Sequence, residues 1–129
     1  MERRAINPWS WQDNFGFVQA NEITGGQKVL FCSGQVSVDQ SGTPVHAGDM
    51  AAQANKALDN LEAVLKGAGM ELSNVVRLTI YTTDVDATIA NYGAVAPRIS
   101  AMKAAQTLIG VARLAFPPLL IEIEATAVA

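Results

Sequence analysis

The sequence predicts an α+β fold in which two helices cover one face of a single β-sheet. Two observations support this prediction: β-type alternation near both ends of the chain, and amphipathic helical patterns between them. The clearest alternation lies in LLIEIEATAV, where Ile121 and Ile123 share one side and Glu122 and Glu124 share the other. Strands that alternate with helices, each with one apolar stripe, predict the order β-β-α-β-α-β-β.

The N-terminal third is expected to hold an aromatic arm and a β-hairpin. Residues 1–14 contain Trp9 and Trp11, whose indoles either pack on the domain edge or line a ligand or subunit cleft. Residues 15–19 and 29–38 are rich in apolar and β-branched side chains, and a Gly-Gly turn lies between them. This pattern predicts two strands of one hairpin.

The second of these strands contains the residues CSGQ. We expect Cys32 to be a small buried residue, because reactive thiols need an accessible, electropositive setting. Ser33 and Gly34 interrupt the apolar run, so they indicate either a β-bulge without a function or a polar face toward a ligand. His46 follows in a loop without Cys, Asp or Ser partners at a familiar spacing, and is interpreted as a surface residue.

Residues 50–65 form the clearest helical pattern, with small and apolar side chains at spacings of three and four. Asp49 is a plausible N-cap, and Gly67 suits the C-terminal end. The polar side of this helix is expected to include Gln53.

The rest of the chain is expected to contain three strands and a second helix. Residues 75–82 are β-branched and aromatic, which favours a strand. Residues 86–102 predict a helix that Pro97 kinks or restarts. Its inner stripe is expected to contain Ile89, Tyr92, Val95 and Ile99. The last two strands are joined through Phe116-Pro117-Pro118 and are predicted to be antiparallel neighbours.

Composition narrows the class of protein. The chain has 129 residues, half of them apolar, which fits one domain over residues 1–129. A net charge of -3 and scattered Lys and Arg give no footprint for nucleic acid, and no apolar run is long enough for a membrane helix. One cysteine fits a cytoplasmic protein, and one Cys with one His argues against a zinc site. Apolar side chains on both strand faces suggest self-association.

Several segments together resemble the RidA/YjgF family, the reactive-intermediate deaminases once labelled endoribonuclease L-PSP. They are CSGQVSVDQSG, the helix that begins AAQANKAL, VVRLTIYTTD, GVARL and IEIEATAV. The resemblance runs from about residue 15 to residue 128. It implies a chorismate-mutase-like fold and a homotrimer with clefts between its subunits, and no cofactor is expected.

The resemblance also implies a site, with departures from the pattern of its deaminase members. Alignment on GVARL puts Gln106 where those members hold the substrate carboxylate with an arginine. Leu108 stands where many carry cysteine, and Phe17 where they carry tyrosine. Glu122 matches the acidic residue that positions or activates a water. A guanidinium pairs bidentately with a carboxylate, whereas the amide of Gln106 is neutral.

We therefore expect a homotrimer that acts on a small reactive imine, enamine or carbonyl compound other than the usual 2-imino acids. Glu122 would position the water, and a second set of residues would bind the substrate. This set contains Phe17, Ser33, Gly34, Gln106 and Leu108. The alternatives are a trimer that binds a small molecule without turnover and, as a minor one, an endoribonuclease.

Overall fold

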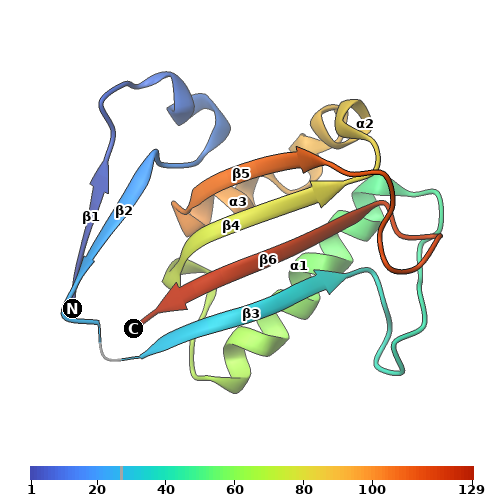
Figure 1. Ribbon diagram of the computed structural model, residues 1–129, viewed down its shortest axis with the longest axis horizontal. Coiled ribbons are helices and arrows are strands. Elements are labelled where there is room, and N and C mark those ends of the chain that lie inside the picture. Colours follow the sequence, from blue (N-terminus) through green and yellow to red (C-terminus); the bar gives the residue numbers. More distant parts are fainter. Residues whose placement is uncertain (27) are drawn as a thin grey trace.

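The computed structural model describes residues 1–26 and 28–129 and contains strands, α-helices and short 3-10 helices (Figure 1). The strands are β1 (Glu2–Ile6), β2 (Ala20–Thr24), β3 (Val29–Val36), β4 (Val75–Thr82), β5 (Ala105–Gly110) and β6 (Ile121–Val128). The α-helices are α1 (Met50–Gly67), α2 (Val85–Ala90) and α3 (Ala96–Met102). The 3-10 helices are η1 (Trp11–Phe15), η2 (Leu72–Asn74) and η3 (Tyr92–Ala94).

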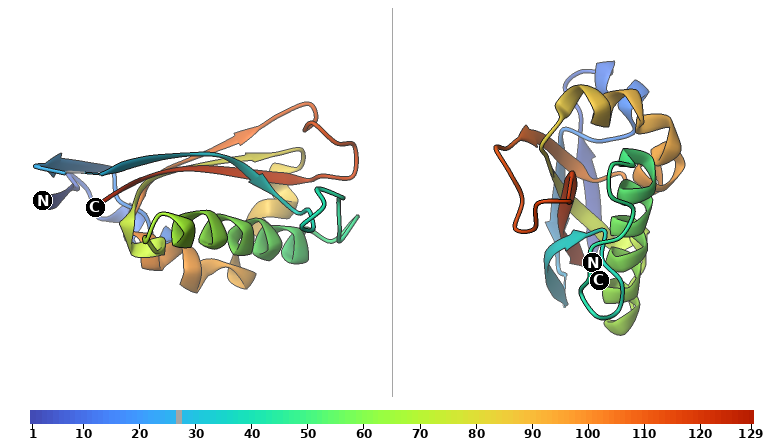
Figure 2. Two further views of the ribbon diagram at one scale, coloured as in Figure 1. Left: turned by 90° about the horizontal axis from the view of Figure 1, so that it is seen from below. Right: turned by 90° about the vertical axis from the view of Figure 1, so that its right-hand side faces the viewer.

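Four strands form the main sheet, in the order β3-β6-β4-β5. β6 is antiparallel to both β3 and β4, and β5 is parallel to β4. All three α-helices lie on one side of this sheet (Figure 2). The predicted α+β class with helices on one face is confirmed, and β1 and β2 add a separate two-stranded sheet.

α1 packs its apolar side against the inward side of the central strand β6. Leu58, Leu61 and Leu65 are buried in the same core as Ile121 and Ile123. The predicted helix is confirmed and ends two residues later than expected. Its N-cap is as predicted: the Asp49 side chain accepts a hydrogen bond from the Ala52 N–H.

The prediction that Gln53 lies on the polar side of α1 is wrong. Its side chain is 0% exposed. The amide nitrogen donates to the Pro118 carbonyl at 2.9 Å, and the amide oxygen accepts from the Leu120 N–H at 2.8 Å. A buried amide is tolerated because these bonds satisfy it. Gln53 therefore joins α1 to the loop that leads into β6.

β4 spans the predicted residues, and the second helical segment restarts at a proline. α2 ends at Ala90, and α3 has Pro97 in its first turn, where the missing N–H costs nothing. Val95 and Ile99 are buried as predicted. Ile89 was expected inside but is 60% exposed, because α2 ends before a continuous stripe can form.

The predicted hairpin of residues 15–19 with residues 29–38 is wrong. Phe15 ends η1 and is followed by Gly16 at φ +73°, a left-handed conformation that suits glycine. The strand begins later, at Ala20, and pairs with β1 inside the expected arm. Residues 15–19 lie beside β5 instead, where Val18 forms an isolated bridge with Ala105.

Arg3 ties the small sheet to the domain. Its guanidinium donates to the Asn21 side chain within the hairpin at 3.2 Å. The same group donates to main-chain carbonyls of Ser73, Val75 and Met102 at 2.6 to 2.9 Å. Burial lowers the pKa of Arg3. These bonds hold the β1–β2 hairpin against η2, β4 and the end of α3.

The prediction that the last two strands are antiparallel neighbours is also wrong. β4 lies between β5 and β6. The connection over residues 111–120 starts where the Val111 N–H bonds the Thr82 carbonyl and returns where the Thr83 N–H bonds the Leu120 carbonyl. The chain thus crosses the end of β4 before it enters the sheet again, which local alternation cannot reveal.

The sheet face opposite the helices is open. β6 presents Glu122 and Glu124 there, while Ile121 and Ile123 face the core. Phe31 on β3 pairs with Thr126 and is 81% exposed. Val29, two residues earlier on the same side of β3, is 50% exposed, and exposed apolar side chains that lie together on a sheet face mark an interaction surface. Separately, none of the helices in the described part of the chain is long and apolar enough to cross a membrane.

Candidate functional site

Glu122 lies directly over a β-bulge. The register of β3 against β6 shifts between Cys32 and Gln35, so Ser33 and Gly34 form the bulge. A Cβ atom added to Gly34 would stand 1.8 Å from Oε1 of Glu122. Only a glycine leaves room for the carboxylate in this position. We name Ser33, Gly34 and Glu122 the bulge site.

The surroundings of Glu122 favour its protonated form. Burial raises the pKa of Glu122, and the negative charge of Glu124 raises it further. Glu124 itself accepts a hydrogen bond of 2.6 Å from the Tyr81 hydroxyl. This bond, together with burial and the carboxylate charge, raises the pKa of Tyr81. The Glu124 carboxylate is therefore engaged by Tyr81, whereas the Glu122 carboxyl group exchanges its proton at a higher pH than an ordinary glutamate does.

A second concave site lies at the β5 edge of the sheet, on the helix side. Its volume is about 480 Å³, within the usual range for small-molecule sites. The aromatic side chains that line it are Phe15, Phe17 and Tyr92, and the aliphatic ones are Ile80, Ile89 and Leu108. We name this hollow the β5-edge pocket.

Three polar side chains complete the lining: Asn14, Thr88 and Gln106. The Thr88 hydroxyl is engaged with Thr82 and the Asp84 carbonyl. The side-chain amides of Asn14 and Gln106 have no hydrogen-bond partner within residues 1–26 and 28–129, so both can bind a ligand. Register explains why Gln106 and Leu108 share the pocket, because they pair with residues of β4 that face the helices.

The aromatic wall is fixed to the domain. Trp11 meets Phe15 and Phe17 edge-on, with ring centroids 6.4 and 5.8 Å away. The Tyr92 hydroxyl donates to the Phe15 carbonyl. A Cβ atom on Gly16 would collide with Ser100, so the turn after η1 lies against α3. Trp11 thus packs against two lining residues without lining the pocket itself, and both indoles are largely exposed, Trp9 at 60% and Trp11 at 55%.

The predicted site residues thus fall into two groups. Phe17, Gln106 and Leu108 lie together in the β5-edge pocket. Ser33, Gly34 and Glu122 lie together in the bulge site, on the other face of the sheet. Sequence reasoning missed the other six residues that line the pocket: Asn14, Phe15, Ile80, Thr88, Ile89 and Tyr92. The aromatic density around Phe15 was a usable signal, but it was assigned to a strand.

The other single-residue predictions concern residues outside both sites. Cys32 is buried as predicted, and burial raises the pKa of its thiol. His46 is exposed on its loop, as expected of a surface residue. Arg113, the arginine of the GVARL segment, was not assigned to the site; it donates to the main-chain carbonyls of Leu114 and Ala115 in the loop before β6.

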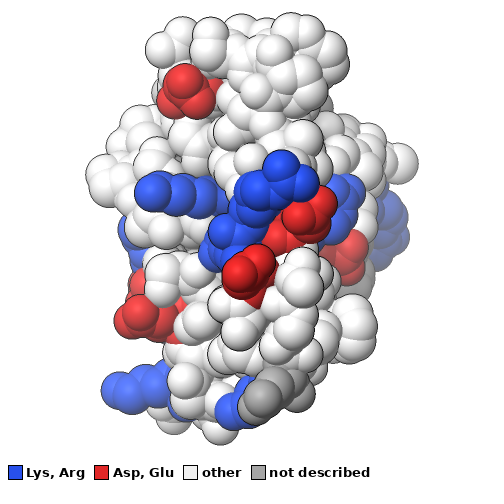
Figure 3. Space-filling view, turned by 90° about the vertical axis from the view of Figure 1, so that its left-hand side faces the viewer, with Lys and Arg blue, Asp and Glu red and all other residues white. Residues whose placement is uncertain are grey.

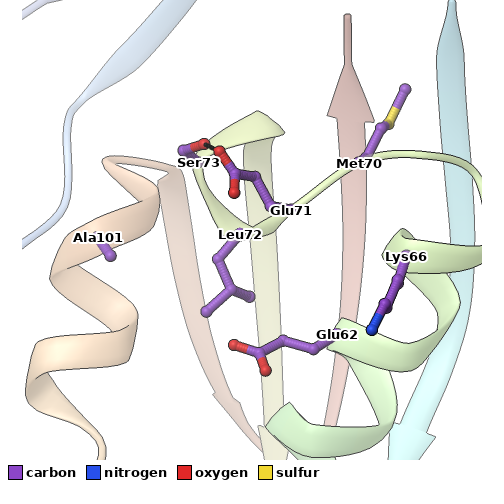
Figure 4. A pocket seen from close by; sticks show the side chains of 7 residues that line it. All are labelled: Glu62, Lys66, Met70, Glu71, Leu72, Ser73 and Ala101. Atoms are coloured by element: carbon purple, nitrogen blue, oxygen red, sulfur yellow. Dashed lines mark hydrogen bonds between the residues drawn. The ribbon is translucent and has the colours of Figure 1, made fainter.

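A larger hollow of about 550 Å³ lies between the end of α1, η2 and α3 (Figure 4). It contains Glu62, Lys66 and Glu71, and the Glu71 carboxylate accepts a bond from the Ser73 hydroxyl. None of the predicted site residues lines it.

On the end of the molecule drawn in Figure 3, basic and acidic side chains are interspersed. Within the described residues, His, Cys, Asp and Glu form no cluster of three that could hold a metal ion.

Comparison with known proteins identifies the family. A family model described as Endoribonuclease L-PSP matches residues 15–129, and the chain belongs to this family, that of the RidA/YjgF proteins. The crystal structure of the Rid-family protein YyfB from Yersinia pestis is 40% identical, covers 100% of both chains and has a TM-score of 0.86.

Two curated relatives extend the comparison. The 2-iminobutanoate/2-iminopropanoate deaminase of Escherichia coli K12 is 37% identical over 103 residues, 78% of this chain and 79% of that protein. Protein DfrA of Myxococcus xanthus is 39% identical over 82 residues, which span 64% of this chain and 56% of DfrA. The family therefore contains imine deaminases as well as members with other names.

Proposed function

We propose that this chain forms a homotrimer that hydrolyses a small, uncharged imine, enamine or related carbonyl compound in a cleft between subunits. Glu122 of one copy positions the attacking water. Phe17, Gln106 and Leu108 of the next copy bind the substrate. The observation that carries the proposal is the separation of the bulge site and the β5-edge pocket on opposite faces of one sheet.

A second copy of the chain can bring a bulge site and a β5-edge pocket together, which one copy cannot do. Glu122 lies on β6 and Gln106 on β5, two strands away, which is about 10 Å across the sheet before the opposite directions of the side chains are added. A water on Glu122 cannot touch a ligand in the pocket of the same chain. The open sheet face, with exposed Phe31, offers the apolar surface for packing of another copy.

The chemistry assigned to Glu122 follows from its surroundings. Hydrolysis of an imine needs a base to take a proton from water as its oxygen attacks the carbon, and then an acid to protonate the departing nitrogen. A carboxyl group whose pKa is raised suits both steps better than an ordinary glutamate, because its carboxylate is a stronger base and its acid form persists to higher pH. Such a group contributes about 10²–10⁴-fold to a rate.

The proposed charge of the substrate follows from Gln106. The resemblance puts an arginine of deaminase members at this position, and the β5-edge pocket is lined by uncharged side chains in the described residues. Hydrogen bonds to charged groups are worth about 1.5–3 kcal/mol each. Loss of one such bond weakens binding of a substrate carboxylate by about ten- to a hundred-fold, and loss of a bidentate pair by about 10²- to 10⁴-fold, since about 1.4 kcal/mol is a factor of ten.

The test is ammonia release from freshly generated 2-iminopropanoate and from an uncharged imine, for the wild type and for Gln106→Arg, Glu122→Gln and Glu124→Gln. We expect little wild-type turnover of 2-iminopropanoate and at least a tenfold gain in Gln106→Arg. Glu122→Gln should lose turnover of the uncharged imine about 10²-fold or more. Glu124→Gln, which removes the same charge two residues away, is the matched control. It also removes the lesser cause of the raised pKa of Glu122, but it should keep most of the turnover because burial, the larger cause, remains.

Three outcomes would contradict the proposal. Rapid wild-type turnover of 2-iminopropanoate would show that a group other than Gln106 binds the carboxylate. A protein that sediments as a monomer would contradict the cleft between subunits. A Glu122→Gln variant with full turnover would contradict the role assigned to the Glu122 carboxylate. A ligand that stabilises the protein without being consumed would favour the binding-only alternative, which the uncharged, mainly apolar pocket also permits.

A further inference from the structure

We infer that the β5-edge pocket selects an uncharged compound in which a planar ring carries an amide, imine or carbonyl group, and that Phe15 and Gln106 determine this selection. This inference rests on the proposed function, since it names the substrate class of the same site. It goes beyond it by assigning a ring-binding wall and a polar end to particular side chains.

The wall is suited to a flat apolar group. Phe15 and Phe17 have ring centroids 6.5 Å apart with an interplanar angle of 41°, and Trp11 closes the cluster from behind. Phe15 is 54% exposed although it belongs to a fixed turn. An exposed aromatic side chain beside a pocket of about 480 Å³ gains apolar contact when a ring enters.

Two primary amides supply the free polar groups of the lining. Gln106 lines the pocket from β5, and Asn14 lines it from η1. Each offers one acceptor oxygen and two N–H donors, and both are free of partners in the described part of the chain. An amide or imine group on the ligand, which also donates and accepts, can bond both. A carboxylate offers acceptors alone and brings a charge that no lining side chain neutralises.

The pocket is formed before a ligand binds. Gln12, the neighbour of Trp11 in η1, is fully buried, and its amide oxygen accepts a bond from the Gln19 side chain. The Tyr92 hydroxyl donates a hydrogen bond to the Phe15 carbonyl and so fixes the end of η1. A ring therefore enters a fixed wall, which lowers the entropic cost of binding.

The experiment compares two probes of the same shape, benzamide and benzoate, with acetamide as a probe that lacks the ring. Binding to the whole protein is followed by ¹H–¹⁵N NMR, on the Gln106 side-chain amide and the Trp11 indole N–H. We expect benzamide to bind at least tenfold more tightly than either other probe and to shift both signals. Phe15→Ala and Gln106→Leu should each weaken benzamide binding at least fivefold. Trp9→Phe, an exposed aromatic position outside the pocket, should bind it as the wild type does.

The inference is overturned if benzoate or acetamide binds as tightly as benzamide. It is equally overturned if millimolar benzamide leaves both signals unmoved, or if Phe15→Ala and Gln106→Leu bind it like Trp9→Phe. Its failure is separate from that of the proposed function. Ammonia release that depends on Glu122, without a preference for benzamide, would contradict only the proposed ligand class. Specific benzamide binding without turnover of any uncharged imine would contradict the proposed hydrolase activity instead.

Discussion

Gly34→Ala should remove the function of Glu122 while it leaves the fold intact. The added Cβ would stand 1.8 Å from Oε1, 2.6 Å from Cδ and 2.9 Å from Cγ of Glu122. These separations are all below a van der Waals contact, so the carboxylate has to turn away. The glutamate side chain is flexible, and turning it costs about 0.5–1.5 kcal/mol if it leaves its rotamer.

The backbone change partly offsets this cost. Gly34 has no left-handed φ, so an alanine can adopt its conformation. Replacing glycine by alanine at such a position stabilises by about 0.4–1 kcal/mol, because the unfolded chain loses freedom. We therefore expect a change in the free energy of unfolding of less than about 1 kcal/mol. Turnover that depends on Glu122 should nevertheless fall by about 10²-fold or more.

Two assays check this prediction. Carboxyl ¹³C titration by NMR follows the pKa of Glu122, which should fall toward the ordinary value of a glutamate when the group leaves its partly buried position. Thermal unfolding measures stability. Gly67→Ala is the matched control, because a Cβ atom there meets nothing within 4 Å. A Gly34→Ala variant with full turnover and a pKa of Glu122 that stays raised would refute the reasoning.

Three further changes test the structure. Burial raises the pKa of Glu122, so ionisation of this group costs the folded state free energy. This penalty is absent below about pH 4, grows as the pH rises from there to the raised pKa, and is constant above it. Glu122→Gln should thus raise Tm at pH 7 and lose that advantage near pH 4, and an equal gain at both pH values would speak against it. Gln53→Ala leaves the Leu120 N–H without its partner and should lower the free energy of unfolding, measured by chemical denaturation, by about 1–3 kcal/mol or more. A decrease below about 0.5 kcal/mol, which is usual for a surface substitution, would be inconsistent with the burial of Gln53. Arg3→Ala should speed hydrogen exchange in the β1–β2 hairpin with little change in the core, whereas Arg4→Ala, whose ion pair with Glu22 is exposed, should not.

Features set by residues close together in the chain were predicted correctly, whereas contacts between distant residues were not. The helix of residues 50–65, its Asp49 cap and the strand of residues 75–82 were correct, because periodicity and capping act over a few residues. The restart at Pro97 was also local, since proline fixes its own φ and lacks an N–H. The position of Gln53 was missed, because its partners lie in a loop more than 60 residues away.

The sequence by itself determined the α+β class, the alternating faces of β6 and, through its resemblance, the family. It could not determine which strands are neighbours, because pairing depends on where the loop over residues 111–120 crosses the sheet. Nor could it show that Gln106 and Glu122 lie on opposite faces, since the side of the sheet on which a residue projects is decided by register with β4 and by the bulge at Gly34. Only the folded chain shows that the residues expected in one cleft form two separate groups on opposite faces of the sheet.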